Sequence, residues 1–302
     1  MTAVQQRPEG TTFVPPRRRR RPTWLSLHST RAALPFAIIL LVYVIVAIVP
    51  HLFVGTADLS SHLESRLRAP GSVVEGTRHL LGTDQLGRDV LNRVVYGTRV
   101  SLLIAFAAVL VAGAVGTALG IVAGIARPWV GAIIMRIADI VLSIPFFLLA
   151  ILTVVALGPS LMNVVLCLAL IRWPRYTRVA YASTLEAKGK EFVRSAEAIG
   201  APAWWIVFRH LLPEVMPSLI VVATLELGTM VIYEASLSFI GLGVQPPTAS
   251  WGSMLSDGRE YISTAWWLTT FPGLALFILI LSVNLLGDFI RDRLDPTQQG
   301  KA

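Results

Sequence analysis

The sequence contains few charged residues. Lysine, arginine, aspartate and glutamate make up 15% of its 302 residues, whereas a typical globular domain carries about 25%. Apolar residue types make up 54% of the chain, and the mean hydropathy is +0.66. A chain with so little charge cannot cover a water-facing surface of ordinary size. The composition therefore excludes a disordered protein, argues against a soluble enzyme and indicates a membrane protein.

The sequence patterns of several kinds of chemistry are also missing. Cys167 is the only cysteine, which excludes a disulfide within the chain. There is no G-x-x-x-x-G-K-[ST] pattern for nucleotide phosphates and no G-x-S-x-G pattern for a hydrolase nucleophile. The five histidines include no pair four residues apart, so a zinc or nickel centre is not supported. We therefore expect no catalytic residue, no metal and no cofactor in this chain.

Six apolar segments are long enough to cross a membrane, since about 20 helical residues span the hydrocarbon core. A long charge-free run is divided by Gly158-Pro159, a pair that interrupts helices. The sequence thus predicts an all-α membrane protein with six transmembrane helices. The predicted spans are residues 32–54, 100–126, 131–157, 161–181, 215–242 and 265–287.

The basic residues predict the orientation. With both termini in the cytoplasm, 19 of the 26 lysines and arginines lie inside and 7 lie outside, as the positive-inside rule requires. The arm of residues 1–31 and the tail of residues 291–302 would then be cytoplasmic, and residues 55–99 would lie outside. Arg17–Arg21 could bind nucleic acid, but directly before a span this run is better interpreted as a determinant of topology. We expect a multi-pass protein of the bacterial inner membrane, in contact with lipid and not with nucleic acid.

The longest cytoplasmic loop, residues 184–214, has the pattern of a helix, a stop and a second helix. Gly200 can adopt the left-handed conformation that ends a helix. Pro202 suits the first turn of the helix that follows, and Pro213 is expected to close the unit before the membrane. Such a rigid loop transmits force better than a flexible connection.

This loop resembles the EAA loop of ABC importer permeases. Arg194-Ser195-Ala196, Gly200 and Leu212-Pro213 match its spacing, although Arg194 and Ser195 replace the first two motif residues and His210 replaces an isoleucine. Further stretches resemble the C-type permeases of the dipeptide, oligopeptide and nickel family, and together the resemblance covers residues 32–296. These stretches are His79–Val90, Glu234–Gly243, Trp251-Gly252, Gly258-Arg259 and Asn284–Asp288.

The resemblance implies a type I ABC importer permease fold with a core domain at residues 100–290. It also implies a B-type permease partner, two ATP-binding subunits that hold ATP and magnesium, and an extracytoplasmic substrate-binding protein that delivers a peptide. The loop would couple the permease to an ATPase. The expected coupling residues are Arg194, Ser195, Ala196, Glu197, Gly200, Leu212 and Pro213.

Polar residues inside the predicted spans are candidates for the translocation path. Glu226, Thr229, Tyr233 and Ser236 follow one another at helical spacing and share one face. They either line the path or form hydrogen bonds between helices, and for Glu234 the second interpretation is favoured. The two glutamates, Glu226 and Glu234, are costly at membrane depth when charged and need a partner or water.

Other membrane residues suggest packing. Asp139 is expected to form an ion pair with Arg136. Arg172, Arg175 and Arg178 would contact lipid headgroups or the loop acids Glu186 and Glu191. Small residues spaced four apart allow two helices to approach closely; they are Gly116, Gly120 and Gly124.

The outer segment of residues 55–99 is expected to form a cap or an amphipathic helix that touches the binding protein, or to be only a spacer. Three other interpretations of the whole chain stay open. The same machinery could import nickel chelates, glutathione or another peptide-like solute. The chain could be a stand-alone secondary transporter, although no internal repeat is visible in the sequence, or it could be a membrane anchor without a path of its own.

Overall fold

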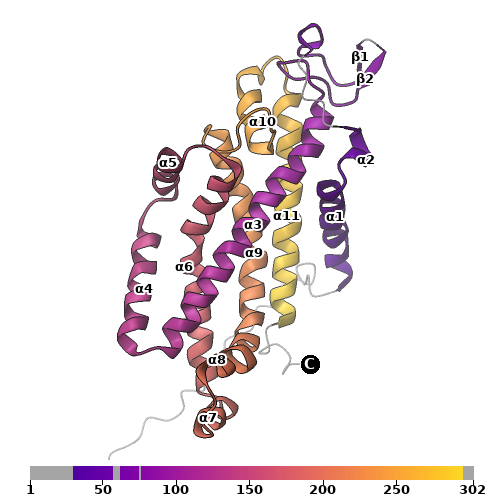
Figure 1. Ribbon diagram of the computed structural model, residues 1–302. Helices are drawn as coiled ribbons and strands as arrows, with labels where there is room; N and C mark the ends of the chain where they lie inside the picture. Colours follow the sequence, from indigo (N-terminus) through magenta and orange to yellow (C-terminus); the bar gives the residue numbers. More distant parts are fainter. Residues whose placement is uncertain (1–29, 57–61, 75, 295–302) are drawn as a thin grey trace, which may run out of the picture.

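The computed structural model describes residues 30–56, 62–74 and 76–294, and shows long helices that run roughly parallel (Figure 1). Residues 1–29 of the predicted N-terminal arm and the last eight residues of the tail lie outside the described part. The helices are α1 (Thr30–Ile48), α2 (His51–Val54), α3 (Val90–Ile125), α4 (Pro128–Ser143), α5 (Phe146–Leu157), α6 (Leu161–Lys188), α7 (Glu191–Ala198), α8 (Ala203–Ile206), α9 (Leu212–Phe239), α10 (Trp251–Gly258) and α11 (Trp267–Leu294).

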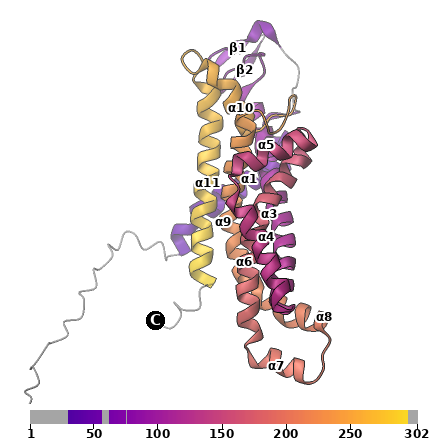
Figure 2. The ribbon, with the colours of Figure 1, turned by 90° about the vertical axis from the view of Figure 1, so that its left-hand side faces the viewer.

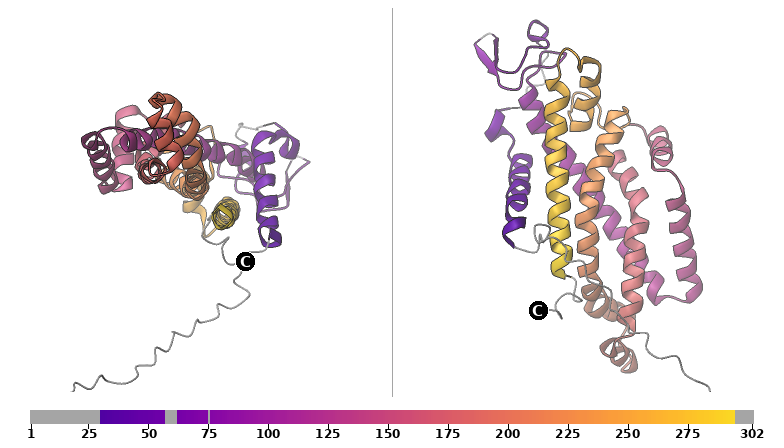
Figure 3. Two further views of the ribbon diagram at one scale, coloured as in Figure 1. Left: turned by 90° about the horizontal axis from the view of Figure 1, so that it is seen from below. Right: turned by 180° about the vertical axis from the view of Figure 1, so that it is seen from behind.

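The helices are arranged around α3, which packs along α6 and also contacts α9. Helix α11 packs on α9, and α1 packs on α11. Helix α1 and the α4–α5 pair lie on opposite flanks of the molecule (Figure 3). Helices α7 and α8 extend from one end, whereas α10 and the hairpin of β1 (Ser72–Val74) and β2 (Thr77–His79) lie at the other end (Figure 2). The two ends of the molecule thus carry different elements, and the long helices between them form an apolar body.

Glycines form the contact between α3 and α6. A Cβ atom added to Gly116 would lie 2.5 Å from the Trp173 carbonyl oxygen, and one added to Gly120 would lie 2.5 Å from the Ala180 Cβ. At Gly124 the nearest atom would be the Thr184 Cγ2, at 2.6 Å. The predicted close approach along this glycine face is therefore confirmed, and its partner is α6.

Among the described residues, three helical stretches are long and apolar enough to cross a membrane, namely Val90–Ile125, Ala203–Phe239 and Trp267–Arg293. The bent pair of α4 and α5 adds a fourth if it counts as one span. Helix α6 has 28 residues but carries three arginines in its middle part, and α1 is a shorter apolar helix. Large apolar side chains on one side of α1 are exposed, as expected for a helix in contact with lipid. They are Leu34, Ile38, Leu41 and Ile45.

The single helix predicted for residues 131–157 is wrong. Helix α4 ends at Ser143, and α5 begins at Phe146 after a bend of 95°. Pro145 has no N–H for the helical hydrogen bond, and a residue before proline avoids the helical conformation. Ile144 accordingly has φ −82° and ψ 128°. Residues 140–157 carry no charge and are largely apolar, but Pro145 interrupts the helix there.

The second predicted span begins earlier than residue 100. Helix α3 starts at Val90, and the Asp89 carboxylate caps it by accepting a hydrogen bond from the Asn92 N–H. Helix α3 therefore includes Arg93 and Arg99, which lie near its N-terminal end. Long basic side chains are tolerated at the end of an apolar helix because their charged groups can reach water. A separate amphipathic helix before α3 is also wrong for residues 62–74 and 76–89, which form a 3-10 turn (Leu63–Ser65), the β-hairpin and loops.

The start of α9 also differs from the prediction. Pro213 does not close a unit, since the chain is helical from Ala203 to Phe239. A π-helical turn (Val207–Leu211) joins α8 to α9, and the Leu212 N–H bonds to the Val207 carbonyl. This wider turn accommodates Pro213, which lacks an N–H and would clash with the carbonyl four residues before it. The end of the predicted cytoplasmic loop and the predicted fifth span therefore form one continuous rod.

Candidate functional site

A buried ion pair joins α6 to α9 in the apolar body. The Arg172 Nε donates to the Glu226 Oε2 at 2.6 Å, and the Arg172 Nη2 donates to Oε1 at 2.8 Å. The Arg175 Nη1 lies 3.1 Å from the same Oε1. Only 1% of the Glu226 side chain is exposed. A carboxylate this deeply buried requires such partners.

The partners of the membrane arginines differ from those expected. Arg172 and Arg175 contact Glu226 instead of lipid headgroups or the loop acids. Arg178 pairs with Asp139 on α4, so the predicted pair of Asp139 with Arg136 is wrong. Arg136 is close in sequence, but Arg178 comes from a neighbouring helix that faces Asp139.

Aromatic rings adjoin this ion pair. The Tyr233 ring stacks on the Phe146 ring with centroids 3.9 Å apart, and the Arg172 guanidinium lies 5.3 Å from the Tyr233 centroid. Phe146 is the first residue of α5, directly after the break in the third span. The structure thus brings together α5, α6 and α9 at one point.

Of the four predicted path residues, the structure places Glu226 and Tyr233 in this cluster. The Thr229 and Ser236 hydroxyls donate to carbonyls of their own helix, at Leu225 and Ile232. Glu234 lies outside the cluster and is fully buried, where its Oε1 accepts a hydrogen bond from the Ser238 hydroxyl. The sequence shows that Arg172 lies deep in a predicted span. It does not show that the partner is Glu226, which is 54 residues away on another helix.

The predicted coupling residues lie on α7 and on the rod that follows it. Gly200 has φ 76°, as expected for a left-handed helix end. The Gly200 N–H bonds to the Glu197 carbonyl, and the Ala201 N–H bonds to the Ala196 carbonyl. This pair of bonds is the Schellman motif, and it turns the chain sharply back toward α8.

The unit of α7 and the start of the rod has a small apolar core of its own, which makes it rigid. Val193 and Ala196 of α7 are buried against α6 and the rod; the other buried members are Ala187, Ile206 and Leu211. Lys190, before α7, donates to the Glu214 carboxylate at the start of α9. This hydrogen bond raises the pKa of the Lys190 ammonium above its ordinary value.

The outward surface of α7 is both polar and apolar. Arg194, Ser195, Glu197 and Gly200 are exposed, whereas Ala196 faces the small core and Leu212 is partly buried. Pro213 is exposed on the rod. Phe192 and Ile199 add apolar surface, and 81% of Ile199 is exposed.

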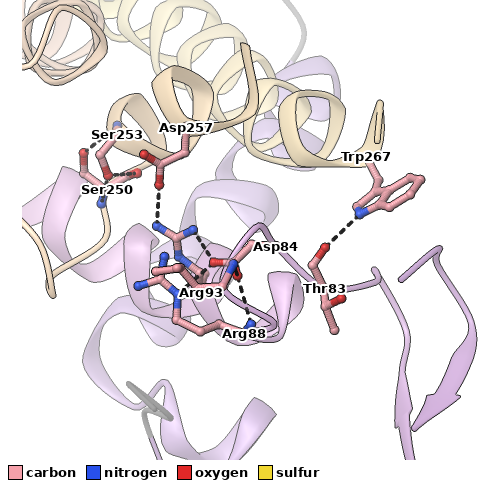
Figure 4. Close-up of polar contacts among 9 residues, drawn as sticks. Thr83, Asp84, Arg88, Arg93, Ser250, Ser253, Asp257 and Trp267 are labelled. Carbon is pink, nitrogen blue, oxygen red and sulfur yellow. Dashed lines mark hydrogen bonds and ion pairs between the residues drawn. The ribbon is translucent and has the colours of Figure 1, made fainter. Parts of the chain in front are cut away.

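A second polar cluster at the opposite end was missed by the sequence interpretation (Figure 4). The buried Asp84 carboxylate accepts hydrogen bonds from the Arg88 Nε at 2.8 Å and the Arg93 Nη1 at 2.7 Å. The Arg93 Nη2 donates to Asp257 on α10 at 3.0 Å, and the Trp267 indole donates to the Thr83 carbonyl at 3.2 Å. This network fixes the outer segment onto α3, α10 and α11, so the segment is a packed cap.

An apolar groove of about 570 Å³ runs between α3 and the rod of α8 and α9. Its walls include Gly113 and Ile121 on α3 and Met216 and Ile220 on α9. The groove carries almost no polar surface. It therefore offers an apolar helix face rather than a site for a polar ligand.

Comparison with known proteins shows the family. Residues 116–299 match the family described as binding-protein-dependent transport system inner membrane component. The di/tripeptide transport system permease protein DppC of Pseudomonas aeruginosa is 39% identical over 92% of both chains. The probable D,D-dipeptide permease DdpC of Escherichia coli is 41% identical, over 79% of this chain and 78% of its own. The glutathione permease GsiD of Pectobacterium atrosepticum is 43% identical over 72% of both chains.

Solved structures show the same fold. Two structures of the MetNI methionine ABC transporter in inward-facing conformations match this chain with a TM-score of 0.55, at 24% and 25% identity. Each match covers 67% of this chain and 96% of the other. The family match, the permease relatives and the shared fold establish that this chain belongs to the binding-protein-dependent transport system inner membrane component family, the membrane subunits of ABC importers.

Proposed function

We propose that this chain is the C-type permease of an ATP-driven importer of di- and oligopeptides, and that it forms half of the translocation path. The observation that carries the proposal is the rigid unit of α7 on a helical rod that continues into the membrane. The relatives named for dipeptide, D,D-dipeptide and glutathione transport support a short peptide as cargo. Glutathione or another small peptide-like solute is the alternative cargo of the same machinery.

In this proposal the chain crosses the membrane six times, through α1, α3, the α4–α5 pair, α6, α9 and α11. The end that carries α7 lies in the cytoplasm together with both termini. Exposed tryptophans support these two boundaries, because tryptophan favours the membrane interface. Trp129 and Trp204 are exposed near the α7 end, and Trp266 is exposed near the opposite end.

The ATPase subunits would dock on α7, with Arg194, Ser195, Glu197 and Gly200 at the contact. The buried Ala196 would hold α7 in place, and Leu212 and Pro213 would pass the movement of α7 into α9. ATP and magnesium belong to those ATPase partners, and this chain has no catalytic role. A B-type permease would supply the other half of the path, and the substrate-binding protein would bind the packed outer cap.

Cross-linking from α7 tests the coupling contact. Cys167→Ala removes the only native thiol, and Ser195→Cys then places one exposed thiol on α7. Labelled with benzophenone maleimide and irradiated in the assembled importer, this chain should form an adduct with an ATPase subunit, because the contact is direct.

Ser263→Cys is the matched control, since Ser263 is exposed at the opposite end of the molecule. This variant should give no adduct with the ATPase. If Ser195→Cys gave none either, or if both positions gave equal yields, α7 would not be the docking helix.

A further inference from the structure

The arginines of α6 are not balanced by equal numbers of acids. Arg172, Arg175 and Arg178 lie three residues apart on one side of this helix. Arg178 pairs with Asp139, which leaves two arginines to share the single carboxylate of Glu226. The group of Arg172, Arg175 and Glu226 therefore carries one net positive charge.

The two arginines use that carboxylate unequally. Arg172 occupies both Glu226 oxygens through two short bonds, and 13% of its side chain is exposed. Arg175 reaches only Oε1, through Nη1 at 3.1 Å, and 55% of its side chain is exposed. In the part of the chain that the structure describes, Arg175 makes no other hydrogen bond or ion pair. A guanidinium has five N–H donors, so most of those on Arg175 have no acceptor among the described residues.

In the six-span arrangement proposed above, Arg175 lies within the fourth span. It is 14 residues after Leu161 in a helix of 28 residues, which places it about 21 Å along a rod of about 42 Å. An arginine facing lipid there is costly, so its exposed side must face water or protein.

The break between α4 and α5 supports a water-lined space beside this group. Phe146 at the break stacks on Tyr233, which lies under the Arg172 guanidinium. Non-helical backbone at membrane depth occurs where it is buried in protein or lines a cavity. Interrupted helices near the membrane centre are also where transporters bind substrates.

We propose that Arg175 binds the terminal carboxylate of the peptide as it passes through the path, and so selects for substrates with a free carboxylate. Arg172 is the positioning residue, because it holds Glu226 and leaves the Arg175 guanidinium available. Arginine binds carboxylates through two parallel hydrogen bonds, which gives strength and orientation. This inference rests on the proposed peptide importer and adds the chemical group that its path recognises.

Uptake of two peptides by the complete importer tests the role of Arg175. The importer is reconstituted in lipid vesicles with its binding protein saturated either with alanyl-alanine or with its C-terminal amide, and rates are compared per loaded binding protein. Wild type should transport the free acid faster than the amide. Arg175→Gln should reduce uptake of the free acid about tenfold or more, as expected for one charged hydrogen-bond pair, and should leave uptake of the amide unchanged. Arg175→Lys should retain only part of the preference, because lysine keeps the charge but cannot form the two parallel hydrogen bonds.

Arg178→Gln is the matched control on the same helix, because Arg178 is similarly exposed but pairs with Asp139. It should leave the ratio of the two rates unchanged. Equal effects of Arg175→Gln on both peptides would show a merely structural role and overturn the inference. Equal wild-type rates for the two peptides would overturn it without any variant. If wild type transported neither peptide, the proposed function itself would fail.

Discussion

At the scale of single residues, charged side chains inside the apolar body such as Arg172 and Glu226 are held in ion pairs between helices. Glu226 was recognisable from the sequence as an acid within a span, and the high energy of a buried charge implied a partner. The identity of that partner was not predictable, since Arg172 lies on another helix and its depth depends on exact helix ends. The same limit applies to Asp84, whose network reaches Asp257 through Arg93.

The pair of Arg172 and Glu226 should therefore be strongly coupled in stability. Glu226→Gln should lower the free energy of unfolding by about 3–5 kcal/mol, because it leaves the largely buried Arg172 without a counter-charge. Arg172→Gln in the same chain should restore part of this loss. Denaturant unfolding of the purified importer in detergent measures the coupling. It is followed for each single variant and for the double variant. Strictly additive losses would contradict a direct pair.

At the scale of helices, the glycine contact between α3 and α6 is the part that sequence spacing predicted best. Four-residue spacing of small residues has one physical use in a membrane, which is close helix approach. The bend at Pro145 and the π-helical turn before Pro213 were harder to predict. In both places the apolar pattern continues, and only the missing proline N–H changes the backbone.

Two alanine substitutions on α3 should have opposite effects. A Cβ on Gly120 would meet the Ala180 Cβ at 2.5 Å and the Thr177 carbonyl oxygen at 2.6 Å, neither of which is a flexible chain end. Gly120→Ala should lower stability by about 1–3 kcal/mol through overpacking. At Gly113 the nearest atom would be the Tyr176 Cε1 at an ordinary 3.5 Å. Gly113→Ala should leave stability unchanged or raise it by up to about 1 kcal/mol, because alanine favours helix.

The melting temperatures of the two variants in the same detergent provide the comparison. A Gly120→Ala protein as stable as wild type would mean that α3 and α6 separate easily. In that case the glycine face would not determine their packing.

At the scale of the whole molecule, the chain is an ABC importer permease, and in the proposed function its two ends bind different partners. The sequence predicted the mostly helical fold, the family and the two helices separated by a turn at Gly200, because these depend on local patterns. For residues 55–99 it offered a cap as one alternative, but it did not predict the contacts that hold this cap, which join distant segments such as Thr83 and Trp267. The rod from Ala203 to Phe239 is the direct physical link between the cytoplasmic end and the Glu226 cluster.

The most direct test of this account is the uptake of alanyl-alanine into vesicles that contain this chain, its partner permease and the ATPase subunits. With the binding protein outside and ATP enclosed, we expect accumulation that stops when ATP, the ATPases or the binding protein is omitted. A proton or sodium gradient alone should drive no uptake. Accumulation by this chain alone under an ion gradient, without ATPase subunits, would contradict the account and identify a secondary transporter.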